Sequence, residues 1–133
     1  MASSDSNSST CSGQDVDRWF DQSYEIFNES DADYALIDSI EYYSEFSPIA
    51  SRAEDRYWDH KRLDTPACLQ SIKDLSDQFL FTEWKMYQAA AQGDLDSAVD
   101  YETEIGNISE RIAQEIESLY GEQWRSDIYL LEL

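Results

Sequence analysis

Two long amphipathic patterns fill the segment from Thr65 to Gly121, and the dipeptide Gly93-Asp94 separates them. Apolar side chains recur at intervals of three and four residues, which places them on one face of a helix. Each arm, at about 26 residues, would be about 39 Å long. The short connection predicts antiparallel neighbours. Gly106 interrupts the second arm, and it indicates either close approach of another helix, which we expect, or a tolerated defect in the helix. The apolar positions are Cys68, Ile72, Leu75, Phe79, Met86 and Ala89 or Ala90 in the first arm, with Thr82 at one step, and Leu95, Ala98, Tyr101, Ile105, Ile108, Ile112, Ile116 and Leu119 in the second.

Start and stop signals bound both arms. Thr65 can cap a helix, and Pro66 fits the first helical position because it needs no hydrogen-bond acceptor there. Gly93 and Gly121 can take the left-handed conformation that ends a helix. Asp94 is a favourable N-cap for the second arm.

Helical patterns also precede this hairpin. The first is expected from Asp15 to near Glu29, with a polar break over residues 28–33. A second region runs from about residue 33 to 62, with Pro48 in its middle. Ser47-Pro48 could cap a new helix, or Pro48 could kink a continuous one. Because the apolar stripe keeps its phase across Pro48, we expect one kinked helix.

These patterns predict a single all-α domain, an up-down bundle of three to five helices built on the long antiparallel hairpin. The chain has 133 residues, which is the length of one domain. Its 4 Gly and 2 Pro predict few turns, as expected for long helices. We expect a disordered Ser-rich tether over residues 1–14 and the bundle over residues 15–121. The apolar tail, residues 122–133, is expected to pack on the bundle, although it could instead be a docking peptide for a partner.

The two cysteines, Cys11 and Cys68, allow several interpretations. A disulfide between them would join the N-terminus to the start of the hairpin, and it would require an oxidising compartment. Alternatively, Cys68 is a buried inert thiol and Cys11 is free. Lipid attachment at Cys11 is a third interpretation, but the preceding Ser and Thr residues do not form a lipidation motif.

No motif in the sequence indicates catalysis, so we predict a protein without enzymatic activity. His60 is the only histidine, and its place near a helix end is typical of a surface or capping residue. A single histidine excludes a di-iron bundle, and together with two cysteines it cannot form a four-ligand zinc site. No Gly-rich loop has phosphate-binding spacing. We therefore expect no metal and no cofactor.

The charge is strongly negative: 29 acidic residues stand against 9 basic ones, for a net charge of -20. Such a surface repels nucleic acid and anionic membranes and attracts basic proteins. No apolar run is long enough to cross a membrane. The second arm of the hairpin has the clearest acidic face, either a solvated helix surface or a surface for a basic partner. The candidate partner-binding residues are Asp96, Asp100, Glu104, Glu110 and Glu117.

The order Tyr57, then Leu63-Asp-Thr-Pro-Ala-Cys68-Leu69, a long helix, Ala-Gln-Gly-Asp94 and a second long helix resembles small exported bacterial helical-bundle proteins, often lipoproteins and mostly uncharacterised. The resemblance covers about residues 57–120 and implies an extracytoplasmic bundle without a stated activity. The opening residues do not form an export signal, which departs from these proteins unless the sequence is a mature form. A cytoplasmic location is the alternative.

Three hypotheses for function follow. The first is a non-enzymatic extracytoplasmic bundle with a binding or structural role. The second is an acidic inhibitor, immunity protein or DNA mimic, whose carboxylates occupy a basic protein's groove as phosphates would. In the third, the charge is an adaptation to salt and indicates no partner.

Overall fold

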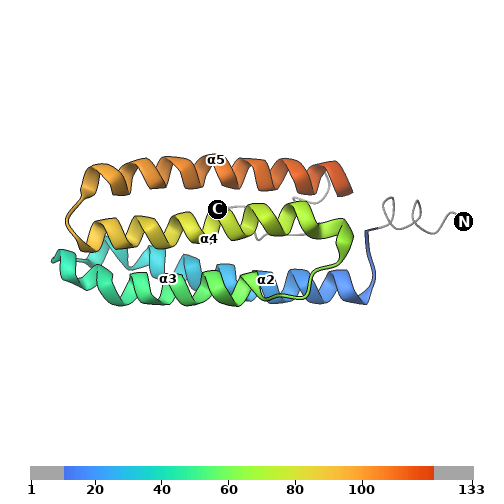
Figure 1. Cartoon of the computed structure of the whole chain (residues 1–133), viewed down its shortest axis with the longest axis horizontal. Helices are drawn as coiled ribbons and strands as arrows, with labels where there is room; N and C mark the ends of the chain where they lie inside the picture. Colours follow the sequence, from blue (N-terminus) through green and yellow to red (C-terminus); the bar gives the residue numbers. More distant parts are fainter. Residues whose placement is uncertain (1–10, 122–133) are drawn as a thin grey trace, which may run out of the picture.

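The computed structural model describes residues 11–121 and confirms an all-α helical bundle. Each of the four α-helices within these residues runs antiparallel to the next (Figure 1). The tail expected at residues 122–133, and residues 1–10 of the expected tether, lie outside the described residues. The α-helices are α2 (Gln14–Ala35), α3 (Phe46–Lys61), α4 (Gln70–Ala91) and α5 (Leu95–Tyr120), with short 3-10 helices η1 (Ile37–Ser39), η2 (Tyr43–Glu45) and η3 (Ala67–Leu69) between them.

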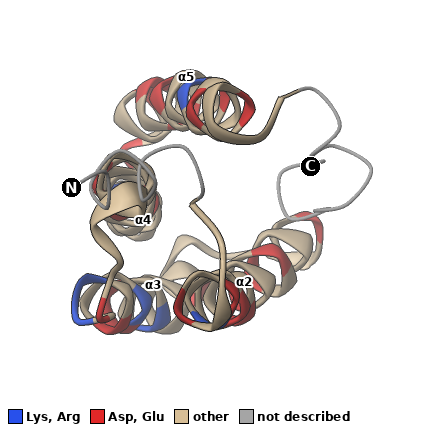
Figure 2. Ribbon diagram, turned by 90° about the vertical axis from the view of Figure 1, so that its right-hand side faces the viewer, with Lys and Arg blue, Asp and Glu red and all other residues tan. Residues whose placement is uncertain are grey.

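Helix α4 is the shared element of the bundle. It packs against α3 on one side and α5 on the other, while α2 lies beside α3 (Figure 2). At the end that holds both chain ends of the described region, a core of Trp19, Ile72, Ile108, Ile112 and Ile116 joins α2, α4 and α5. A second cluster, nearer the turn of the hairpin, joins α3 and α4 and contains Ile49, Ala50, Ala53, Met86 and Tyr87.

The turn between α4 and α5 forms as the sequence predicts. Gly93 has φ 77°, and a Cβ there would also meet the Tyr43 ring at 3.2 Å. Asp94 caps α5, its carboxylate accepting a hydrogen bond from the Ser97 backbone N–H at 3.2 Å. Gly121 ends α5 with φ 80°. Left-handed conformations of this kind are what glycine tolerates and other residues resist.

Two expectations about the hairpin were wrong. Pro66 precedes the 3-10 helix η3 as its N-cap residue and lies outside α4, and Thr65 caps neither helix. The Thr65 hydroxyl instead accepts a hydrogen bond from Trp19 Nε1 at 2.9 Å and donates one to the Leu63 carbonyl at 3.0 Å. Gly106 makes no close approach, because a Cβ at this position would meet no described atom within 4 Å beyond its own helix.

Helix α2 is longer than the sequence indicates. It continues through the expected polar break at residues 28–33 and ends at Ala35. Ser30 and Asp33 are buried in this segment and pair with polar side chains of other helices. Two of the polar residues that suggested a loop, Ser30 and Asp33, therefore face the interior of the bundle.

The kinked helix expected across Pro48 does not form. Two 3-10 turns separate α2 from α3, and Pro48 lies in the first turn of α3, where a missing N–H is harmless. Glu45 holds the preceding turn, because its carboxylate accepts hydrogen bonds from the backbone N–H groups of Glu41 and Tyr42. The alternative, in which a new helix starts near Pro48, matches the structure.

Candidate functional site

A buried chain of polar side chains links α2, α3 and α4 around His60. The Nε2 atom of His60 shares a hydrogen bond of 2.8 Å with Ser23 Oγ, and its Nδ1 atom lies 2.8 Å from an Asp77 carboxylate oxygen. Lys73 Nζ donates to the other oxygen of Asp77 at 2.6 Å. His60 is 0% exposed, so the expectation of a surface or capping histidine was wrong. The side chain projects between α2 and α4, and its two partners offset the cost of burying the ring nitrogens.

The order Ser23–His60–Asp77 has the connectivity of a hydrolase triad. Three features of its surroundings differ from a catalytic site. Ser23 is 2% exposed, and the space beside it measures about 10 Å³, which is at the lower limit for holding a single water and too small for a substrate. Ser23 lies inside α2, where backbone N–H groups are already bonded within the helix and cannot form an oxyanion hole. We interpret the triad geometry as structural.

The charge of Asp77 is fixed by its partners. Burial alone would raise the pKa of this carboxyl, but hydrogen bonds from His60 and Lys73 outweigh burial and hold the pKa below its ordinary value. The carboxylate of Asp77 is therefore ionised near neutral pH, and it forms hydrogen bonds with His60 and Lys73 at the same time.

A second buried network lies nearer the hairpin turn. Arg56, 3% exposed, donates to Asp33 at 2.6 Å and to Glu83 at 3.2 Å. Arg52 also donates to Asp33, at 2.7 Å, and Ser30 donates to Glu83. Two carboxylates thus share two guanidinium groups across α2, α3 and α4.

The two carboxyls of this network shift in opposite directions. Burial would raise the pKa of Asp33, but the hydrogen bonds from Arg52 and Arg56 lower it. Burial raises the pKa of Glu83, and here the opposing effects of Arg56 and Ser30 do not overcome it. Glu83 lies deeper, so the desolvation of its charged form dominates.

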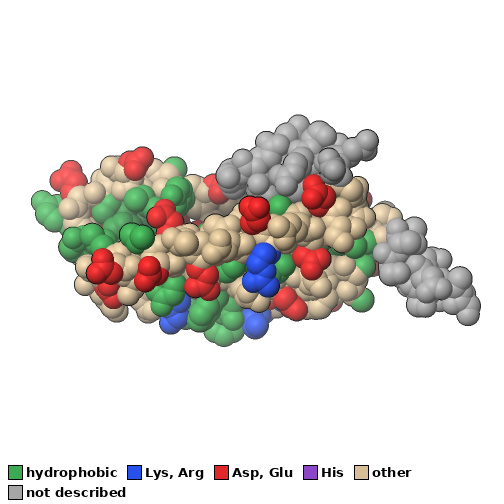
Figure 3. All heavy atoms as spheres, turned by 90° about the horizontal axis from the view of Figure 1, so that it is seen from above, with side chains coloured by type: hydrophobic (Ala, Val, Ile, Leu, Met, Phe, Trp, Pro, Cys, Tyr) green, Lys and Arg blue, Asp and Glu red, His purple; other side chains and the backbone are tan. Residues whose placement is uncertain are grey.

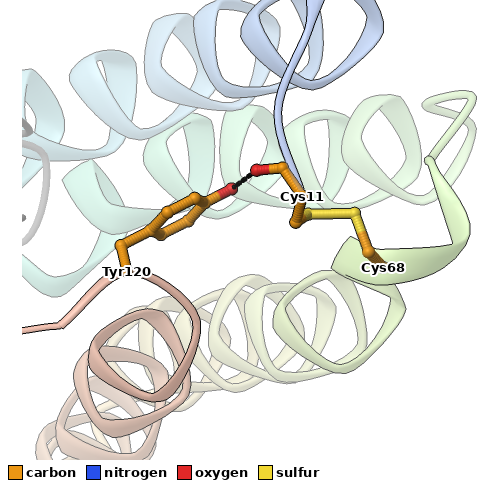
Figure 4. Close-up of a disulfide and its surroundings, with 3 residues drawn as sticks. All are labelled: Cys11, Cys68 and Tyr120. Carbon is orange, nitrogen blue, oxygen red and sulfur yellow. Dashed lines mark hydrogen bonds between the residues drawn. A yellow bond between two sulfur atoms is a disulfide. The ribbon is translucent and has the colours of Figure 1, made fainter. Parts of the chain in front are cut away.

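The disulfide predicted as one alternative is present between Cys11 and Cys68. The sulfur atoms are 2.02 Å apart and the Cα atoms 5.8 Å apart. The Tyr120 hydroxyl donates a hydrogen bond of 2.7 Å to the Cys11 carbonyl (Figure 4). The start of the described chain is therefore fastened both to the entry of α4 and to the end of α5.

The candidate partner-binding carboxylates lie on α5. Asp96, Asp100, Glu104 and Glu110 are exposed, and Glu117 is half-buried. Within residues 11–121 no ion pair includes a carboxylate of α5; the paired acids lie on α2, α3 and α4. The face seen in Figure 3 carries acidic side chains along its length and few basic ones. The structure thus places these residues on one helix, and none of them forms an ion pair with a described residue.

In the described part of the chain, no group of three or more His, Cys, Asp or Glu side chains could hold a metal ion. None of the described helices combines the length and apolar character needed to cross a membrane.

In comparisons with protein-family models, curated proteins and solved structures, the chain gives no significant match. The resemblance to exported helical bundles therefore stays a prediction, and the interpretation of each site depends on the geometry given above.

The sequence carried weak signals for both buried networks. Ser23 lies on the apolar stripe of α2, and Ser76, Asp77 and Glu83 adjoin the stripe of α4. Polar residues at core-facing positions indicate buried hydrogen bonds. The partners could not be identified in advance because they come from other helices, up to 53 residues away in the chain.

Proposed function

We propose that this protein is a non-enzymatic, extracytoplasmic helical bundle with a binding role. The Cys11–Cys68 disulfide carries the proposal, because such bonds form and persist in oxidising compartments and are rare in the cytosol. The bond closes a sequence separation of 57 residues and lies in the apolar core. Its position within the core supports a structural rather than a redox-active bond.

Fractionation of the natural host with an antibody against the bundle tests the location. We expect the protein in the secreted, periplasmic or surface fraction, where added protease can reach it in intact cells. A cytosolic marker protein serves as the control for lysis. Recovery only with that marker would overturn the proposed location.

Reactivity of Ser23 tests the absence of enzymatic activity. A fluorophosphonate probe labels the activated serine of a hydrolase. We expect no labelling of the folded protein at pH 7–8, because Ser23 is buried and lacks an oxyanion hole. Stoichiometric labelling of the wild type that is lost in Ser23→Ala would contradict the proposal.

A second candidate function is inhibition of a basic protein through the acidic face of α5. The observation that favours it is the lack of ion pairs for the carboxylates of this helix within the described residues. Asp96, Asp100 and Glu104 follow one another at four-residue intervals, so their charges are spaced about 6 Å apart along the axis. A row of this kind can occupy a groove that binds phosphates.

The chain offers a matched control for this second function. The test variant is Asp96→Asn, Asp100→Asn, Glu104→Gln. The control is Asp17→Asn, Asp21→Asn, Glu25→Gln, which removes the same residue types at the same spacing from the exposed face of α2. Both variants are titrated against a panel of basic nucleases at several salt concentrations.

We expect only the α5 variant to weaken binding, about tenfold or more, and to flatten the dependence of log Kd on log salt. Equal effects of the two variants would indicate attraction by net charge alone. That result, or binding that does not depend on salt, would overturn the inhibitor proposal.

A further inference from the structure

A cleft of about 300 Å³ lies between α2 and α5, with α4 beneath it. Its lining combines apolar and acidic side chains. Phe27 of α2, Phe79 and Met86 of α4 and Ile105 of α5 provide apolar surface. Gly106 adds open space, because no side chain projects from it. The volume is at the lower end of small-molecule sites and holds one organic molecule of modest size.

A hydrogen bond limits the cleft near the hairpin turn. The Tyr34 hydroxyl of α2 donates to a Glu102 carboxylate oxygen of α5 at 2.9 Å, and both residues line the cleft. This contact joins the two helices where their backbones are otherwise apart. An occupant therefore fits against Phe27, Phe79 and Ile105, and a helix could not run through the whole length between α2 and α5.

The carboxylates that line the cleft differ in whether they have a cationic partner. Glu83 lines it but pairs with Arg56, so this buried carboxylate already has a cation. Asp31 and Glu102 also line it, and no ion pair within residues 11–121 includes either of them. Burial raises the pKa of Asp31, which is the response of a carboxyl that has lost water without gaining a counter-charge.

We propose that this cleft binds a small organic cation, an apolar or aromatic group that carries one amine. The apolar group lies against Phe27, Phe79 and Ile105, and the ammonium group pairs with Asp31 and Glu102. Charge complementarity selects the amine over neutral and anionic molecules of the same shape. This site is separate from the exposed row of carboxylates on α5, so either proposal can fail without the other.

Three probes of nearly the same size test the ligand class: 4-phenylbutylamine, 4-phenylbutanol and 4-phenylbutanoate. Each is titrated into the full-length protein and followed by the amide NMR shifts of Ile105, Gly106 and Ser109. We expect the amine to bind with a Kd of about 1 mM, which is ordinary for so few atoms. The alcohol should bind about tenfold more weakly, and the anion should not bind. Equal affinities, or no shifts at these amides, would overturn the proposal.

Variants locate the binding. Gly106→Phe fills the cleft and should abolish binding of the amine, whereas Asn107→Phe adds the same side chain at the next, exposed position of α5 and should have no effect. Asp31→Asn should weaken the amine about fivefold and leave the alcohol unchanged. Urea unfolding confirms that each variant is folded. Binding that survives Gly106→Phe would overturn the proposal.

The tail of the chain is the competing occupant. A full-length variant with Ile128→Asp and Leu131→Asp makes residues 122–133 unsuitable for an apolar cleft. Equal amine affinity in this variant and the wild type supports the proposal. Binding of the amine only in this variant would assign the cleft to the tail and overturn the proposal.

Discussion

The two sides of α4 are built differently. Towards α5, the interface is aliphatic and contains Ile72, Ile108 and Ile112. Towards α2 and α3, α4 contributes buried Asp77 and Glu83 to ionic and hydrogen-bonded networks. The side of α4 that faces α2 and α3 thus combines apolar contacts with buried ionic groups, whereas the side that faces α5 has no ion pair among the described residues.

This difference separates contacts that mainly stabilise the fold from contacts that mainly determine how the helices dock. Aliphatic packing tolerates small changes in register, because its contacts have no required partner atoms. The polar side requires Arg56 to lie between Asp33 and Glu83, and it requires His60 to lie between Ser23 and Asp77. Buried ionic groups add little net stability but are costly to separate. We therefore expect the polar side to fix how α2 and α3 dock, and to be the side that responds to pH.

Arg56→Met should have the largest effect. It leaves the buried carboxylate of Glu83 without its cation, which should lower the free energy of unfolding by about 3–5 kcal/mol. Urea denaturation measures the loss. Adding Asp33→Asn and Glu83→Gln to Arg56→Met should restore more than half of the stability, because no stranded charge remains. A loss below about 1 kcal/mol in Arg56→Met would contradict the account of the polar side.

Loss of the Cys11–Cys68 disulfide should have the next largest effect on stability. With a sequence separation of 57 residues, Cys11→Ser with Cys68→Ser should lower the free energy of unfolding by about 4 kcal/mol. Denaturation of the wild type with and without reductant provides the matched comparison. Identical midpoints would mean that the bond does not constrain the unfolded chain.

Ile112→Ala tests the aliphatic interface. The side chain is buried in the core between α4 and α5, and its truncation should cost about 3 kcal/mol through lost burial and a residual cavity. Arg111→Ala, exposed on the same helix, is the control and should change stability by less than about 0.5 kcal/mol. The cost of Ile112→Ala should be the same at pH 7 and pH 4. A cost that varied with pH would remove the distinction between the two sides.

Asp77→Asn tests the pH response of the polar side. The pKa of Asp77 in the folded state lies below its ordinary value of 3.8, so its ionised form stabilises the fold above about pH 4 and this contribution is lost as the pH falls through the folded-state pKa. The variant should be less stable than the wild type by about 1–2 kcal/mol at pH 7. That difference should shrink as the pH falls below about 4 and through the folded-state pKa. A difference that grew on acidification would show that the sign is wrong.

The smallest effect concerns the exposed charges. Raising NaCl from about 10 mM to 500 mM should raise the Tm of the wild type by a few degrees, because salt screens the repulsion of a net charge of -20. The α5 variant with Asp96→Asn, Asp100→Asn and Glu104→Gln should show a smaller rise. Reversible unfolding of the wild type at low salt would favour the salt-adaptation hypothesis.

The hairpin was predictable because its signals are local. The stripe of isoleucines, the glycines at 93 and 121 and the Asp94 cap each act within a few residues of themselves. The all-α class and the antiparallel arms follow from these features alone.

The polar side was not predictable because its signals are not local. Ser30 and Asp33 lie in a polar stretch that is typical of a loop. Only their hydrogen-bond partners on α3 and α4 explain why α2 continues through this stretch. His60 lies in a polar sequence near a helix end, which is typical of an exposed residue. It is nevertheless buried, and it forms hydrogen bonds with Ser23 and Asp77. The sequence left the state of the two cysteines undecided. A disulfide requires the segment before α2, which contains Cys11, to lie beside the start of α4, and that depends on how the helices pack.

The thiol state of Cys11 and Cys68 in protein taken from its natural host is the most direct test of the central claim. Cells are treated with an alkylating agent before lysis, and the intact mass is then measured with and without reductant. We expect no alkylation until reductant is added, and two modified thiols afterwards. Two alkylated thiols in the untreated sample would contradict an extracytoplasmic, disulfide-linked bundle and would direct the search to partners inside the cell.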